Sequence, residues 1–243
     1  MQCVAEYEQI FSRTALLIGD DGLQRLAAAR VLVAGVGGVG SYAVEALARA
    51  GIGTLTLVDS DVVQASNINR QLHALTTTLG QPKVAVMAER LLQINPDLQV
   101  TPLQELITSD NVPVLLEPGY DLVLDAIDTL SAKLTLLQNC VERQIPVISS
   151  MGAAGKLDPT RIQLADIADS QGCRLARKLR KELRRSGIST GVTVVYSDEP
   201  CSLERLGEPE AEGERRPLGT ISYLPAALGL FMASAAIRRL LSD

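Results

Sequence analysis

RVLVAGVGGVGSYAVEALARAGIGTLTLVD, residues 30–59, contains the pattern that decides the fold of this chain. A β-branched apolar run at 30–35 enters a cluster of glycines, a segment with helical spacing follows at 41–52, and a second apolar run occupies 54–59. This order predicts a strand, a helix and a second, parallel strand. The glycines between the first strand and the helix would allow a tight turn whose N–H groups can approach a phosphate.

The glycine turn makes four residues candidates for binding a nucleotide: Gly35, Gly37, Gly38 and Gly40. Asp59 ends the second strand about 20 residues further on, where a carboxylate commonly accepts hydrogen bonds from ribose hydroxyls. A glycine turn can also serve only to pack a helix closely on a strand. The turn and Asp59 together predict a nucleotide site, but they do not specify a reaction.

The remaining pattern alternates strands with helices. Helical spacing recurs at 82–94, 131–144, 173–187 and 220–241, and strand-like runs occur at 98–104, 120–128, 145–150, 161–168 and 192–197. Alternation of this kind indicates an α/β protein with a Rossmann-like, mainly parallel sheet that carries helices on both faces. We expect a single domain over 1–243, with a nucleotide-binding core at 10–155 and a less regular C-terminal extension at 156–243.

The extension contains three distinctive segments. Seven Lys and Arg residues lie in the helix predicted at 173–187, and a polar stretch rich in Pro and Gly at 198–219 is expected to be a mobile loop. The apolar helix at 220–241 approaches the roughly 20 residues that span a bilayer. Because Pro225 and Gly229 interrupt that helix, we expect it to be buried against the sheet and not to anchor the chain in a membrane.

Composition limits the classes of function. The 243 residues are 47% hydrophobic, enough for one substantial core, and the net charge of −5 excludes a protein that coats nucleic acid by bulk charge. An RNA partner would need a local patch. The four cysteines are widely separated, so a zinc ribbon is not expected, and the first residues lack a signal-peptide pattern, which indicates a cytoplasmic protein.

Charged and amide side chains collect where the strands end. They are Asp59, Asp61, Asn67, Arg70, Gln71, Lys83, Asp125 and Asp128. The carboxyl ends of parallel strands share one edge of a sheet, so these side chains are expected at that edge. A hydride-transfer site does not require Arg70 and Lys83, whereas a triphosphate that is being cleaved does.

Five motifs occur in a fixed order: GVGGVG, DxD, NxNRQ, GxxK and DAID. Over roughly 10–155 this order resembles the ubiquitin-activating-enzyme-like adenylyltransferase superfamily. The resemblance implies ATP as cosubstrate and Asp59 as the ribose ligand, with Asn67, Arg70 and Lys83 at the phosphates. It implies that Asp128 holds Mg²⁺ near the α-phosphate, a hard cation suited to oxygen ligands. Asp61 and Gln71 join the nucleotide site, and Arg70, Lys83 and Asp128 are the candidate catalytic residues.

The segment Phe11-Ser12-Arg13 resembles the short N-terminal arginine motif of the same superfamily. In that motif the arginine reaches across a dimer interface to the ATP of the partner. This chain has Ile10 where a first arginine often stands, so only Arg13 is carried over as a catalytic residue. The resemblance therefore implies a homodimer.

Segments spread over most of the chain resemble one branch of the superfamily, the tRNA threonylcarbamoyladenosine dehydratases: HAL at 73–75, KVAVMAERLLQINP, YDLVLDAID and VVYSDEP. The resemblance implies that ATP activates the threonyl carboxylate of the modified adenosine next to the anticodon, that pyrophosphate is released, and that ring closure expels AMP. The partner would be tRNA. A monovalent cation, Na⁺ or K⁺, is a further candidate cofactor that the sequence does not decide.

Alternatives remain open at this point. An adenylyltransferase could activate a small sulfur-carrier protein and transfer the acyl group to Cys201, although the paired cysteines typical of those branches are missing. A nicotinamide-dependent oxidoreductase could use the glycine turn, and a nucleotide-sensing RNA-binding module needs no reaction. His73 is the single histidine and is expected to be structural. The basic helix at 173–187 is either a solvated face or an RNA contact.

Overall fold

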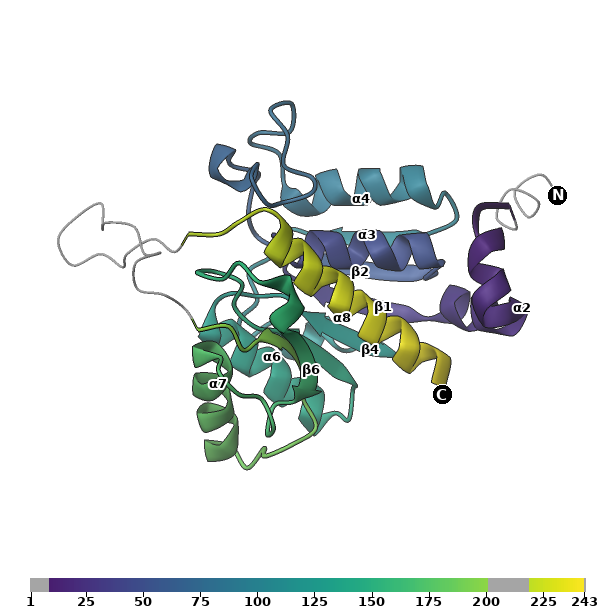
Figure 1. Cartoon of the computed structure of the whole chain (residues 1–243). Helices are drawn as coiled ribbons and strands as arrows, with labels where there is room; N and C mark the ends of the chain where they lie inside the picture. The colour runs from purple at the N-terminus through teal and green to yellow at the C-terminus, as the bar shows by residue number, and fades with distance from the viewer. Residues whose placement is uncertain (1–8, 201–218, 243) are drawn as a thin grey trace.

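Strand β1 (Arg30–Ala34) lies in the interior of a sheet of order β3-β2-β1-β4-β5-β7-β6. The computed structural model describes residues 9–200 and 219–242, and within them seven strands form this one sheet (Figure 1). The other strands are β2 (Thr54–Val58), β3 (Gln99–Leu103), β4 (Leu122–Asp125), β5 (Val147–Ser150), β6 (Ile162–Asp166) and β7 (Thr193–Ser197). All neighbours pair in parallel except β6, which is antiparallel to β7.

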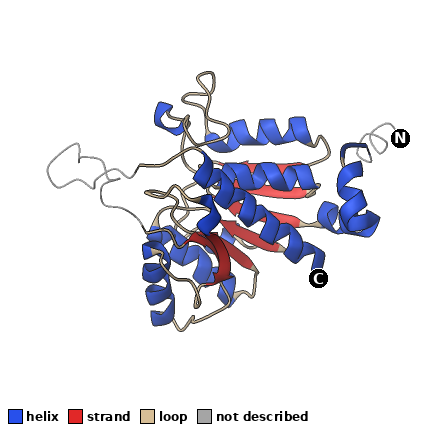
Figure 2. Ribbon diagram, viewed as in Figure 1, coloured by secondary structure: helices blue, strands red, loops and turns tan. Residues whose placement is uncertain are grey.

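Helices cover both faces of the sheet, as the alternating pattern predicts (Figure 2). They are α2 (Ser12–Ala28), α3 (Gly40–Ala50), α4 (Lys83–Ile94), α5 (Val112–Leu115), α6 (Leu130–Glu142), α7 (Arg174–Arg185) and α8 (Tyr223–Ser242), with 3₁₀ turns η1 (Ala65–Asn67) and η2 (Pro159–Arg161). Val31 and Val33 face the core with α3, α4 and α8, whereas Leu32 and Ala34 face the core with α6 and α7. Burial on both faces explains the unbroken apolar run of β1.

The predicted extension contributes β6, β7, α7 and α8 to the same sheet and its covering layers. The strand at 161–168 is thus present but runs antiparallel, a direction that its apolar pattern cannot specify. Asp198 and Glu199 also belong to the folded part of the chain. Asp198 accepts a hydrogen bond from Arg161, directly before β6. Glu199 accepts from the N–H groups of Leu157 and Asp158, in the segment that precedes η2. The predicted loop therefore starts later than residue 198, and its members 201–218 lie outside the described residues.

Helix α8 is long and apolar enough, by length and composition, to cross a membrane. In this structure it packs against α3 and along the sheet, with Leu224, Leu228 and Met232 fully buried at helical spacing. The predicted core position of the closing helix is confirmed. Leu230 and Phe231 lie on its outer side, 52% and 45% exposed.

Close approach of two backbones joins α8 to the glycine turn. A Cβ on Gly229 would lie 2.3 Å from the Val39 carbonyl oxygen and 3.0 Å from the Cβ of Tyr42, and a Cβ on Gly38 would lie 3.1 Å from the Cβ of Pro225. Only a residue without a side chain allows this distance between the helices. The C-terminal helix thus supports the outer side of the nucleotide-binding turn.

The Gly229→Ala variant tests this contact. The new methyl group would overlap the Val39 carbonyl oxygen, so α8 must shift, and we expect the free energy of unfolding to fall by about 1–3 kcal/mol. Ser234→Ala, at an exposed position of the same helix, is the control and should change stability by less than about 0.5 kcal/mol. Urea unfolding followed by circular dichroism measures both. Equal stability of the two variants would contradict the close packing.

Candidate functional site

The backbone of the glycine turn packs against the end of β2 on one side and against the residues that follow β4 on the other. The Gly35 N–H donates to the Val58 carbonyl at 2.7 Å, and a Cβ on Gly35, whose φ is +86°, would lie 2.8 Å from the Ala126 carbonyl oxygen. A Cβ on Gly40 would lie only 1.9 Å from the Gly35 carbonyl oxygen. Val39, the N-cap of α3, makes no side-chain capping bond. The positive end of the α3 dipole is therefore available to an anion at this turn.

Asp59 holds the glycine turn at the end of β2. Its carboxylate accepts from the Val36 N–H at 2.8 Å through Oδ2 and from the Asp61 N–H at 2.9 Å through Oδ1. The side chain is half-buried at the carboxyl edge of the sheet. Asp59 thus has a bracing role in addition to the predicted ribose contact, for which each oxygen keeps a second lone pair.

Residues 67–71, from the end of η1 onward, include three of the predicted site residues. Asn67 is buried and accepts from the Gln64 N–H at 3.1 Å, which shapes the 3₁₀ turn. The Arg70 Nη1 donates to the Ser66 carbonyl at 2.8 Å. Gln71 lies against Gly37, with Nε2 3.6 Å from where a Cβ would stand, and its buried Oε1 has no partner among the described residues. The amide of Gln71 therefore faces the glycine turn.

Lys83 opens α4 as a buried cation. Its side chain is 6% exposed, and Nζ lies 2.7 Å from the Asp61 Oδ2, while the Lys83 N–H donates to the Asp61 carbonyl at 3.0 Å. Asp61 itself is largely exposed. Lys83 and Asp61 therefore act here as an ion pair, and the charge of Lys83 is held in a position where water screens it little.

His73 lies beneath this pair. The imidazole is buried, and neither ring nitrogen has a partner among the described residues. Burial, together with the Lys83 ammonium, lowers the pKa of His73 to about 4. The ring is neutral at physiological pH, in agreement with the predicted structural role.

A fully buried ion pair supports the β4 end of the site. Lys133 on α6 donates to the Asp125 Oδ2 at 2.7 Å and to the Ser149 Oγ at 3.0 Å, and both charged residues are inaccessible to solvent. The other carboxylate oxygen of Asp125 accepts from the Ile127 N–H at 3.1 Å. Asp125 thus caps the turn that leads to Asp128.

Asp128, like Asp61, is an exposed carboxylate at this edge. Its Oδ1 accepts only a long hydrogen bond, 3.4 Å, from the Thr129 hydroxyl. No group of three or more His, Cys, Asp or Glu side chains suitable for a metal occurs among the described residues. One accessible carboxylate fits a magnesium ion that takes its other ligands from water and substrate phosphates.

Arg13 is the predicted site residue that the fold does not bring to this edge. It is exposed in the first turn of α2, and α2 leads into the amino end of β1, whereas the glycine turn follows the carboxyl end (Figure 1). Arg13 therefore has no access to the nucleotide site of its own chain. A contribution to catalysis would require a partner subunit.

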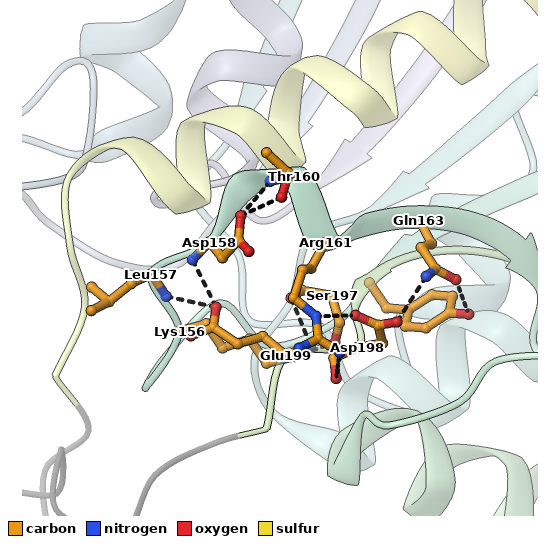
Figure 3. A network of polar contacts seen from close by, with 10 residues as sticks. Lys156, Leu157, Asp158, Thr160, Arg161, Gln163, Ser197, Asp198 and Glu199 are labelled. Carbon is orange, nitrogen blue, oxygen red and sulfur yellow. Dashed lines mark hydrogen bonds and ion pairs between the residues drawn. The ribbon is translucent and has the colours of Figure 1, made fainter.

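A polar network joins the segment that leads into β6 to the residues that follow β7 (Figure 3). Glu199 accepts from the Leu157 and Asp158 N–H groups at 2.8 Å each, and Asp198 accepts from the Arg161 Nε at 2.7 Å. The Gly155 N–H donates to the Gly219 carbonyl at 2.8 Å. Glu199 and Gly219, on either side of 201–218, thus both contact the short segment 155–158.

Thr220, which follows Gly219, contacts the segment that carries Arg70. The Asn69 Nδ2 donates to the Thr220 carbonyl at 3.0 Å, while the Asn69 Oδ1 accepts from the Arg70 Nη1 at 2.9 Å. Sequence patterns did not single out Asn69, Lys133 or Glu199. Lys133 carried a usable signal, because it occupies the apolar face of α6 together with Leu136 and Leu137.

These features together are those of a nucleotide-binding α/β protein. The chain belongs to the ThiF family, whose sequence profile matches residues 11–243.

Relatives of known function narrow this assignment. The tRNA threonylcarbamoyladenosine dehydratase of Bacillus subtilis is 44% identical, with 96% of this chain and 95% of that protein aligned. The crystal structure of the Escherichia coli tRNA N6-threonylcarbamoyladenosine dehydratase with ATP superposes with a TM-score of 0.87 at 39% identity, covering 97% of this chain and 95% of that one. A molybdopterin-synthase adenylyltransferase of Salmonella typhimurium is 40% identical, but over 61% of this chain and 59% of that protein.

Removal of Lys133 tests the buried pair. In Lys133→Ala the Asp125 carboxylate remains in the core without its cation, and we expect the free energy of unfolding to fall by about 3–5 kcal/mol. Arg49→Ala breaks an i,i+4 pair in which the arginine is exposed and Glu45 keeps a second partner, Arg90, so it should cost less than about 1 kcal/mol. Urea unfolding at neutral pH distinguishes the two. Similar losses would show that the Asp125–Lys133 pair contributes no more than a surface pair.

Proposed function

We propose that this chain catalyses the ATP-dependent dehydration of N6-threonylcarbamoyladenosine next to the anticodon of tRNA, which cyclises its threonyl side chain. The observation that carries the proposal is the position of two cations in a chain that aligns with dehydratases over nearly its full length. Arg70 lies against Gly38 of the glycine turn. Lys83 pairs with Asp61, whose N–H donates to the Asp59 carboxylate that holds the turn. A triphosphate whose α-phosphate is attacked needs cations at this position.

The reaction balances without a protein nucleophile. The threonyl carboxylate attacks the α-phosphorus of ATP, the bond to the bridging oxygen breaks, and pyrophosphate leaves. A nitrogen of the substrate's own carbamoyl group then attacks the activated carbonyl carbon and loses its proton, and AMP leaves. The net change is loss of one water from the nucleoside. Crystal structures of the related Escherichia coli dehydratase with ATP and with AMP are consistent with this sequence.

The site residues divide the steps of this reaction among them. The N–H groups of the glycine turn and the uncapped α3 terminus bind phosphate oxygens, and Asp59 receives the ribose. Lys83 and Arg70 offset the charge that develops as pyrophosphate departs. Asp128 would hold Mg²⁺, which polarises the phosphate when bound. Water is excluded on one side by the α8 terminus at Pro225.

Two other candidate functions receive less support. A sulfur-carrier adenylyltransferase would share the ATP site, but the relatives with that activity align with a smaller part of this chain. Its proposed acceptor, Cys201, lies outside the described residues. A nicotinamide-dependent oxidoreductase would not need the buried Lys83. Because the proposed substrate is tRNA, we also propose that the protein is cytoplasmic.

We further propose that the active form is a homodimer built through α2. Leu16 and Leu17 on this helix are 78% and 87% exposed, and Arg13 lies one turn before them. Exposed leucines beside an arginine with no ion pair among the described residues fit a surface that another subunit covers. In such a dimer Arg13 would reach the phosphates bound by the partner.

Arg70→Ala and Lys83→Ala test the adenylation site. Each removes one cation from the phosphate side, so we expect kcat for tRNA-dependent pyrophosphate release to fall about 10²–10³-fold. Arg143→Ala, an exposed cation at the opposite edge of the sheet, should retain normal activity. Mass spectrometry of tRNA nucleosides should show the loss of one water with the wild type and the control alone. ATP turnover without that loss would contradict the assigned substrate.

Mixed subunits test the role of Arg13. Arg13→Ala and Lys83→Ala homodimers should both be inactive. Heterodimers with different purification tags should regain one working site of two, so a random mixture should reach about a quarter of wild-type activity. If Arg13 acted within its own subunit, the heterodimer would have no complete site and mixing would restore nothing.

A further inference from the structure

The basic helix α7 presents a one-sided cationic surface. It carries seven of the chain's 23 Lys and Arg residues and one acid, Glu182. Its apolar positions Ala176, Leu179 and Leu183 are buried against the sheet layer. The cations recur at spacings of three and four residues, which places them on the opposite face.

Two of the seven cations are already engaged. The Arg180 guanidinium donates to the Ile167 and Ser170 carbonyls at 3.1 and 2.7 Å, and Arg185 pairs with Glu182 at 2.8 Å. The side chains of the other five are exposed and make no ion pair or hydrogen bond within 9–200 and 219–242: Arg174, Arg177, Lys178, Lys181 and Arg184. A face with five unpaired cations on a chain of net charge −5 is a local site for a polyanion.

The fold places the beginning of this face at the edge of the sheet where ATP is expected. Gly172 precedes α7, and a Cβ there would lie 2.8 Å from the Asp198 carbonyl oxygen, directly after the end of β7. At the other end the Gly191 N–H donates to Asp166, where β6 ends. Helix α7 therefore starts beside the polar network of Figure 3 and runs away from it, alongside α6.

We infer that the exposed face of α7 binds the sugar-phosphate backbone of the substrate tRNA. This inference rests on the proposed function, which requires that a large RNA be held while one nucleoside reaches the catalytic edge. Twelve helical residues span about 18 Å, enough to follow several consecutive phosphates. The helix carries no aromatic side chain, so the contact is to phosphates and not to stacked bases.

An anionic membrane is the other polyanion that such a face could meet. Helices that lie in a membrane surface insert an apolar face beside their cations. The apolar face of α7 is committed to the protein core, with Leu179 and Leu183 fully buried. The structure therefore favours RNA.

A triple variant, Arg177→Gln/Lys178→Gln/Lys181→Gln, tests the inference in the full-length enzyme. The dissociation constant for threonylcarbamoyladenosine-containing tRNA should rise about 10–100-fold, and the dependence of its logarithm on log salt should lose about three units of slope, one for each cation. KM for tRNA should rise in parallel. KM for ATP and kcat at saturating tRNA should stay within about twofold of wild type, because the changed side chains lie outside the phosphate site.

The matched control neutralises three exposed cations near the opposite edge, Arg143→Gln/Arg238→Gln/Arg239→Gln, and should leave tRNA affinity and the salt slope unchanged. Thermal unfolding confirms that both triple variants are folded. Equal affinity and slope in the two variants would overturn the inference. So would loss of binding to phosphatidylserine vesicles in the α7 variant with tRNA affinity intact.

The binding assay does not depend on turnover, so the two proposals can fail separately. If wild-type enzyme binds tRNA but never removes water from the nucleoside, the proposed reaction is wrong, whereas a salt-dependent loss of binding in the α7 variant still supports the RNA surface. If wild type dehydrates tRNA and the α7 variant binds as tightly, the surface is wrong and the reaction stands.

Discussion

The rest of the structure depends on one steric constraint: a Cβ atom on Gly40 has no room beside the Gly35 carbonyl oxygen. This contact holds the start of α3 against the end of β1. The same turn is bonded to β2 through Val58 and Asp59 and rests on the β4 turn at Ala126. The glycine turn therefore contacts β1, β2, the turn after β4 and the start of α3. A ligand bound at this turn has a fixed position relative to all four elements.

Charge is distributed around this turn by two different means. Asp125 and Lys133 are inaccessible to water and satisfy each other, so they fix the β4 edge without offering charge to a ligand. Lys83, in contrast, is buried along its stem while its partner Asp61 is exposed to solvent. A phosphate that approaches from solvent can replace a solvated carboxylate far more readily than a buried one. Lys133 thus has a structural role, whereas Lys83 is placed to take the chemical role that the proposed function gives it.

The sequence predicted most of the strands and most of the long helices, because apolar runs such as that of β1 are buried on both faces and alternate regularly with helical segments. It did not predict α2, whose Gly19 adopts a φ of +72° within the helix and breaks the helical pattern. Nor could spacing reveal that Asp61 pairs with Lys83, since 22 residues separate them and only the folded edge joins them. Lys133 was missed because a lysine in a helix is exposed by default.

The two ends of the stretch between residues 200 and 219 are anchored on one short segment, through Glu199 with Leu157 and through Gly219 with Gly155. Chain length between two fixed anchors costs little, about 0.6 kcal/mol for each doubling. A change in the length of this stretch would therefore cost little stability as long as both anchors keep their contacts, so insertions and deletions at this point of the chain leave the core undisturbed.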